Sequence, residues 1–185
     1  MTILDNFILK FSDYSLNRKL RKFSRNRELK NLSQCNSILI VSSTLDDTDG
    51  AETARMIKYL KQLNKEVFSL LFIDDPKIEL TPQSSEIKAF NDTHLNRMFI
   101  PKDRDIHLLM EREFDLLIDL TLQESFTLKY IHSLSKSKLK VGAALNYKKR
   151  FGDITFDIQN NPTIPYLIVQ IKHYLTQINQ NQDVA

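Results

Sequence analysis

Residues 37–73 read SILIVSSTLDDTDGAETARMIKYLKQLNKEVFSLLFI, and this stretch decides the fold class. It opens with a short continuous apolar run, Ser37–Ser42, which is typical of a strand covered on both faces. A helix is expected over Ala51–Leu63, where Asp49 and Glu52 have the spacing of a capping box. A second apolar strand, Glu66–Ile73, follows at once. Strand, helix and strand in so short a stretch predict a βαβ unit with a right-handed crossover.

The same alternation continues towards the C-terminus. Further strands are expected at Leu95–Ile100, Phe114–Leu120, Lys138–Gly142 and, at an edge, Asp153–Ile158. Helices are expected at Asp105–Glu113, at Leu122–Leu134 and from Pro162 to residue 178, and a long polar connection, 74–94, holds a short helix near Ser85–Phe90. We therefore predict one α/β domain over residues 34–178, a three-layer α/β/α Rossmann-like fold with a mostly parallel sheet of five to six strands. A polar tail, 179–185, follows it.

The first 33 residues form a basic segment that is expected to be helical. Residues 1–30 hold eight Lys or Arg against three Asp or Glu, whereas the whole chain carries only +3. We expect helical structure over residues 3–30, with a first helix Ile3–Phe11 and a second one capped by Ser12 or Asp13. The predicted partner-binding patch consists of Arg18, Lys19, Arg21, Lys22, Arg25 and Arg27.

Several partners suit such a patch. Lys and Arg on a helix attract phosphates without reading sequence, so RNA or the ribosome is one partner. Another protein is a second, and an anionic membrane surface is a less favoured third. A packed, solvated helix with no partner is the structural alternative.

A second candidate site lies where the strands end. In a parallel, doubly wound sheet, ligands bind outside the carboxyl ends of the strands at the point where strand order reverses. The predicted ligand-binding residues are Ser42, Ser43, Thr44, Asp46, Asp49, Gly50 and Asp119. Hydroxyl groups and helix-start N–H groups there suit an anion, although neither a dinucleotide glycine fingerprint nor a P-loop is present.

Acidic residues also recur after the predicted strands. If they converge they suit Mg²⁺ and phosphoryl chemistry, and otherwise they cap helices and form turns. They are Asp46, Asp47, Asp49, Asp74, Asp75 and Asp119.

Composition and motifs exclude several classes of protein. The single cysteine, Cys35, excludes an internal disulfide and fits a reducing, cytoplasmic setting. No apolar run reaches the length of a membrane span, the N-terminus lacks the features of a secretion signal, and the four histidines form no metal motif. No nucleophile motif is present, so we assign neither catalytic nor metal-binding residues and leave the cofactor open. We expect a non-catalytic binding or adaptor protein; the alternative is a small-ligand binder, or an enzyme of sugar-nucleotide or Mg²⁺-dependent phosphoryl chemistry.

One stretch carries a family resemblance. Residues 114–142 read FDLLIDLTLQESFTLKYIHSLSKSKLKVG. This resembles the N-terminal half of heptosyltransferase-like glycosyltransferases, where an fDlviDl strand leads into a helix and then a basic KxxG strand. The resemblance implies a Rossmann-like fold and an acidic catalytic residue in the loop after the first strand, where this chain has Asp46, Asp47 and Asp49. The whole layout is also similar to uncharacterised bacterial proteins that join a Lys/Arg-rich N-terminal helix to a Rossmann-like body.

Overall fold

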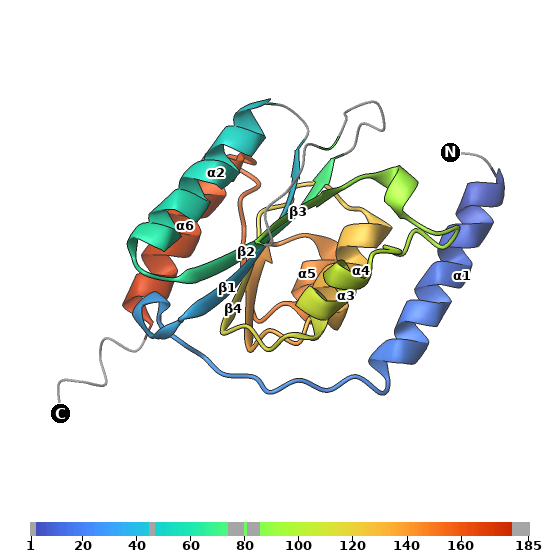
Figure 1. The fold of residues 1–185 in the computed structure, drawn as a ribbon, viewed down its shortest axis with the longest axis horizontal. Coiled ribbons are helices and arrows are strands. Elements are labelled where there is room, and N and C mark those ends of the chain that lie inside the picture. The colour runs from blue at the N-terminus through green and yellow to red at the C-terminus, as the bar shows by residue number, and fades with distance from the viewer. Residues whose placement is uncertain (1–2, 45–46, 74–79, 81–85, 179–185) are drawn as a thin grey trace.

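A six-stranded, all-parallel sheet forms the centre of the molecule (Figure 1). The computed structural model describes residues 3–44, 47–73, 80 and 86–178. Within them the strand order is β3-β2-β1-β4-β5-β6, and every neighbouring pair is parallel. The strands are β1 Ser37–Thr44, β2 Glu66–Ile73, β3 Ile87–Phe90, β4 Leu116–Asp119, β5 Leu139–Ala143 and β6 Ile154–Phe156. This confirms the predicted fold class.

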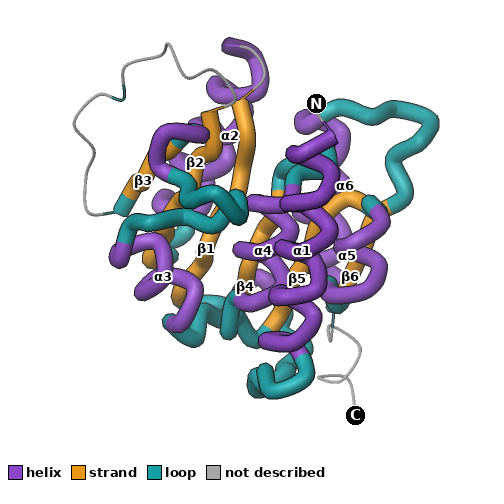
Figure 2. The backbone as a smooth tube through the Cα atoms, turned by 90° about the vertical axis from the view of Figure 1, so that its right-hand side faces the viewer, coloured by secondary structure: helices purple, strands orange, loops and turns teal. Residues whose placement is uncertain are grey.

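Helices cover both faces of the sheet (Figure 1). They are α1 Ile3–Leu20, α2 Asp47–Gln62, α3 Arg104–Glu111, α4 Phe126–Leu134, α5 Asn146–Phe151 and α6 Ile164–Gln177. α2 and α6 pack on one face, and α3, α4 and α5 lie on the other. α1 packs on the outer side of α4: it lies at the right-hand edge of the molecule in Figure 1 and faces the viewer in Figure 2.

Two hydrophobic cores fill the space between the layers. Alternate residues of β1 point to opposite faces, so Ile38 and Ile40 join the core under α2 and α6 while Leu39 and Val41 join the core under α3 and α4. All four side chains are fully buried. This explains why the strand has an unbroken apolar sequence.

The region before α3 differs from the prediction. Residues 87–90 form β3 rather than a helix, because they pair with Ser69–Phe72 of β2. Residues 95–100 form no strand; they contribute only an isolated antiparallel bridge between Leu95 and Pro101. The side chain of Asn96 accepts the N–H groups of Met98 and Ile100, and Phe99 has φ 57°, so this segment turns instead of extending.

The N-terminal segment also differs. α1 is one continuous helix, and Ser12 does not cap a second one: its hydroxyl donates to the Ile8 carbonyl within α1. α1 ends at Leu20, and residues 21–31, the connector, turn at 21–22 and then run extended along the strand-start edge of the sheet (Figure 1). In α2, too, Asp49 lies inside the first turn rather than at its cap, because the helix begins at Asp47.

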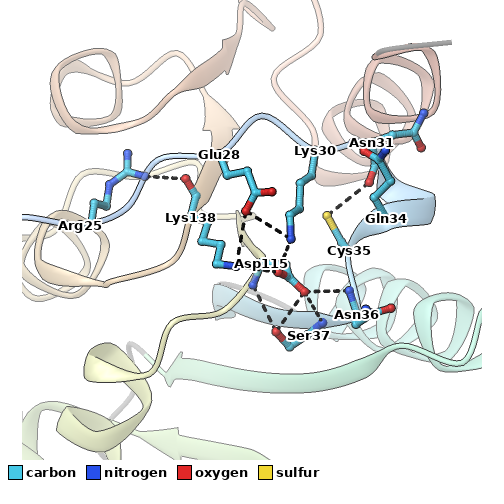
Figure 3. Close-up of polar contacts among 10 residues, drawn as sticks. All are labelled: Arg25, Glu28, Lys30, Asn31, Gln34, Cys35, Asn36, Ser37, Asp115 and Lys138. Atoms are coloured by element: carbon cyan, nitrogen blue, oxygen red, sulfur yellow. Dashed lines mark hydrogen bonds and ion pairs between the residues drawn. The ribbon is translucent and has the colours of Figure 1, made fainter. Parts of the chain in front are cut away.

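Tertiary contacts hold the connector in its extended form. The Arg25 guanidinium donates to both carboxylate oxygens of Asp153 and to the carbonyls of Ser137 and Lys138. Lys30 donates to Asp115 at 2.8 Å, and Asp115 also accepts the N–H groups that open β1 (Figure 3). These bonds join segments far apart in the sequence, so local helical pattern could not reveal them.

Candidate functional site

A cavity of about 600 Å³ opens at the carboxyl ends of the strands. From β1 the sheet continues through β2 and β3 on one side and through β4, β5 and β6 on the other, so strand order reverses between β1 and β4. Ser43, at the end of β1, lines the cavity, as do Gln123–Lys129 after β4. Tyr147 and Arg150, from α5 after β5, complete this side. We call this cavity the crevice; it lies at the switch point where such folds bind ligands.

The lining combines aromatic rings with polar groups. Five aromatic residues face the crevice: Phe72, Phe99, Phe126, Tyr147 and Phe151. Hydroxyl, amide and charged groups lie among them, from Ser43, Gln123, Glu124, Ser125 and Arg150. A few polar groups set in an apolar wall are what orient a small ligand in most binding sites.

α1 forms one wall of the crevice. Leu9 and Asp13 contribute to the lining, and Asp13 forms an ion pair with Lys129 of α4 at 2.6 Å. Leu16, one turn further along α1, is buried in the core shared with α4. The N-terminal helix is therefore a structural part of the crevice as well as a carrier of basic residues.

A buried network of polar side chains centred on Asp119 lies next to the crevice and contacts its lining residue Tyr147. Asp119 Oδ1 accepts from Thr121 Oγ1 at 2.6 Å and lies 2.9 Å from Lys148 Nζ. Its Oδ2 accepts from His132 Nδ1 at 2.9 Å and from the Tyr147 hydroxyl at 3.3 Å. Because Tyr147 also lines the crevice, this network fixes the orientation of one of its walls.

The protonation states in this network follow from burial and charge. Burial alone would raise the pKa of Asp119, but the Lys148 ammonium and the hydrogen bond from His132 outweigh it and hold the pKa below its ordinary value. Burial lowers the pKa of His132 and so favours the neutral ring, with Nδ1–H donating to Asp119 and the buried Nε2 atom without a partner among the described residues. Burial and the Asp119 charge raise the pKa of Tyr147 well above its usual range. Tyr147 is thus a neutral donor.

The predicted crevice residues have different environments. Ser43 is buried and lines the crevice, whereas Ser42 is fully buried, does not belong to the crevice lining, and has no hydrogen-bond partner for its Oγ among the described residues. Asp119 is fully buried, and both its oxygens are engaged within the protein. Thr44 is the last residue of β1, and Gly50 lies in the first turn of α2 together with Asp49. Asp46 is outside the described residues.

The acidic residues give no metal site in the part of the chain that the structure describes. No group of three or more His, Cys, Asp or Glu there is arranged to hold a metal ion. Asp46, Asp74 and Asp75 lie outside the described residues. Cys35 is buried.

The six predicted basic residues divide into two groups. Arg25 and Lys19 bind other parts of the protein. The Arg25 side chain is only 4% exposed and forms an ion pair with Asp153, and Lys19 donates to the Tyr130 hydroxyl at 2.7 Å. Arg27 is 71% exposed and lies 3.8 Å from Asp153. Arg18, Arg21 and Lys22 are exposed at the C-terminal end of α1 and the turn after it.

Sequence reasoning missed Lys129, Tyr147 and Arg150 as crevice residues. Tyr147 and Arg150 follow β5, so the rule that singled out the end of β1 applies equally to them. The aromatic ring of Tyr147 and the charge of Arg150 could have marked them as candidate ligand-binding residues. The sequence does not give the strand order, which places the end of β5 beside the end of β4.

Comparison with known proteins adds family membership. A family model described as "Family of unknown function (DUF6913)" matches residues 9–178. The chain belongs to this family. The DUF6913 match begins within α1, so it includes the crevice wall and the connector as well as the sheet. No curated protein and no solved structure gave a significant match. Within the described ranges, no helix has both the length and the apolar character to cross a bilayer.

Proposed function

We propose that this protein is a non-catalytic binding protein whose crevice takes a small ligand of the nucleoside or nucleotide class, sugar nucleotides included. The observation that carries the proposal is the 600 Å³ cavity at the switch point of a parallel sheet. A volume of that size lies in the range of sites that enclose small molecules.

The lining favours a ligand with a flat ring and hydroxyl groups. Phenyl rings such as Phe126 and Phe151 suit the face of a base, while Ser43, Ser125 and Gln123 offer hydrogen bonds to a sugar. Because Asp13 is paired with Lys129, Arg150 is the cation in the lining best placed for a phosphate.

Binding rather than catalysis is proposed because the carboxylate and the imidazole nearest the crevice are buried and cannot reach a ligand in it. Asp119 and His132 have no exposed side-chain surface, so neither can touch a ligand. Their contacts fix Tyr147 instead. We propose that the protein works in a reducing, cytoplasmic compartment, since its lone cysteine is buried and burial raises the pKa of the Cys35 thiol to about 11.

The test is thermal unfolding with nucleosides, mononucleotides and sugar nucleotides at about 1 mM each. A ligand at a hundred times its Kd stabilises a protein by about 2.7 kcal/mol, so a true ligand raises Tm by several degrees. Arg150→Ala should remove most of the rise for phosphate-bearing ligands. Lys149→Ala deletes the same charge from the neighbouring exposed position, outside the crevice lining, and should keep it. If no compound of this class raises Tm, or if the two variants respond alike to a phosphate-bearing ligand that stabilises the wild type, the proposal is wrong.

A further inference from the structure

The outer face of α1 exposes three aromatic rings in a row. Phe7, Phe11 and Tyr14 are 71%, 57% and 66% exposed. Their spacing of four and then three residues places them on one side of the helix. The opposite side holds the buried Ser12 and Leu16, which pack towards α4. The row therefore points away from the protein.

Cations share this face with the rings. Lys10 lies three residues from Phe7 and four from Tyr14, and Arg18 lies four residues beyond Tyr14, so helical geometry places both beside the row. Arg21 and Lys22 continue the basic character past the helix end, and all four side chains are exposed. Among the described side chains of α1, the acidic ones lie elsewhere: Asp5 and Asp13 are on the inner side, and Asp13 pairs with Lys129.

We propose that this aromatic–basic face binds a single-stranded nucleic acid. Phe and Tyr rings provide stacking platforms for bases, and neighbouring Lys and Arg side chains neutralise the phosphates between them. From Phe7 to Arg18 the face spans about 17 Å at 1.5 Å per residue, which is enough for several nucleotides. The proposal concerns a macromolecule on the outer surface and does not depend on a ligand in the crevice.

The arrangement fits a nucleic acid better than a membrane surface. A helix that lies in a bilayer interface separates a charged face from an apolar one. Here Lys10 and Arg18 lie on the same face as the rings, so burying the rings in lipid would bury cations with them. Alternating rings and cations instead match the alternating bases and phosphates of an unpaired strand.

The test is fluorescence anisotropy of the full chain with a labelled 12-nucleotide oligouridine at low salt. Phe11→Ala and Tyr14→Ala should each weaken binding about tenfold through loss of a stacked base, whereas Tyr14→Phe should stay within about twofold of wild type. Arg18→Ala should weaken binding and reduce the slope of log Kd against log salt concentration by about 0.7. These side chains are exposed, so unchanged Tm values will show that each variant is folded.

The control is Lys58→Ala, which removes the same charge from an exposed position on α2, on the other side of the sheet. It should leave Kd unchanged. Three outcomes overturn the proposal: ring variants that bind like wild type, duplex RNA that binds as tightly as the single strand, or binding to phosphatidylglycerol-containing vesicles without binding to the oligonucleotide.

Discussion

Asp119 at the end of β4 and Lys148 in α5 form an ion pair of 2.9 Å in which neither side chain has any exposed surface. The pair is not isolated, because Lys148 also donates to the Thr121 carbonyl at 2.6 Å. Taking two charges out of water is costly and is repaid only when hydrogen bonds satisfy the remaining valences. The network around Asp119 meets that condition and joins β4, α4 and α5 beneath the crevice.

Removing Asp119 should destabilise the fold strongly. Asp119→Ala leaves Lys148 buried without a counter-charge, and breaking one partner of a buried pair costs about 3–5 kcal/mol. Urea unfolding monitored by circular dichroism measures this loss.

The control is Lys61→Ala. This change breaks the ion pair between Lys61 and Glu86, whose side chains are 44% and 45% exposed, and it should cost at most about 1 kcal/mol. The double variant Asp119→Leu with Lys148→Met leaves no unpaired buried charge and should recover much of the lost free energy of unfolding. If the single and double variants lose equal amounts, the packing of the side chains rather than their charge determines the stability at this position.

Lys140 should make stability depend on pH. Its amino group is buried in β5 with Nζ donating to the carbonyls of His132 and Ser133, and burial, helped by the nearby Arg25 charge, lowers the pKa of Lys140 from 10.5 to about 6. Between those values the unfolded chain holds a proton that the folded chain lacks. The free energy of unfolding therefore rises with pH across this window and falls as pH drops towards 6.

The measurement is urea unfolding at pH 7 and pH 9 for wild type and Lys140→Met. Each pH unit inside the window contributes up to about 1.4 kcal/mol, so wild type should gain about 1–3 kcal/mol relative to the variant. Subtracting the variant removes the contribution of other groups. Parallel pH profiles for the two proteins would mean that Lys140 keeps its proton in the folded state.

The fold was predictable because its determinants are local. Short apolar runs between amphipathic helices identify strands buried on both faces, and β2 was predicted with the observed limits, Glu66–Ile73. Two of the errors occurred where distant contacts decide the backbone. Residues 87–90 extend because β2 is available to pair with them, and the connector extends because Arg25 and Lys30 find carboxylates on Asp153 and Asp115.

For the crevice, the sequence could predict only its location in the fold. The rule for parallel sheets placed it at the strand ends, and Ser43 lies there. The other lining residues come from five separate parts of the chain, among them α1 and α5, and no spacing pattern connects Asp13 with Lys129 or Tyr147 with Asp119. Such pairs depend on how the crossovers pack, which the sequence pattern does not encode.

Arg25 and Arg27 should respond very differently to the same substitution. Both approach Asp153, but Arg25 does so at 2.6 Å with 4% of its side chain exposed, whereas Arg27 lies at 3.8 Å and is 71% exposed. Arg25→Ala should cost about 2–4 kcal/mol, because it leaves a shielded carboxylate and the Ser137 and Lys138 carbonyls without their donor. Arg27→Ala should change stability by less than about 0.5 kcal/mol.

Limited proteolysis gives an independent readout of the same pair. Loss of the Arg25 anchor should make the connector open more often, so trypsin should cut within residues 21–31 faster in Arg25→Ala than in Arg27→Ala, although each variant lacks one cleavage site. Similar cleavage rates in both would show that Asp153 does not anchor the connector.

Gly142 should tolerate no side chain. A Cβ atom added there would lie 2.8 Å from the Asp119 carbonyl oxygen and 3.2 Å from Lys148 Cδ. The Lys148 side chain can move, but the carbonyl belongs to the β4 backbone, which pairs with β5 at this register, Asp119 with Gly142. Gly142→Ala should therefore cost about 1–3 kcal/mol and lower Tm by several degrees. Because the displaced strand carries Asp119, the crevice ligand affinity should fall as well, and a variant with wild-type Tm would show that β4 and β5 can separate locally without loss.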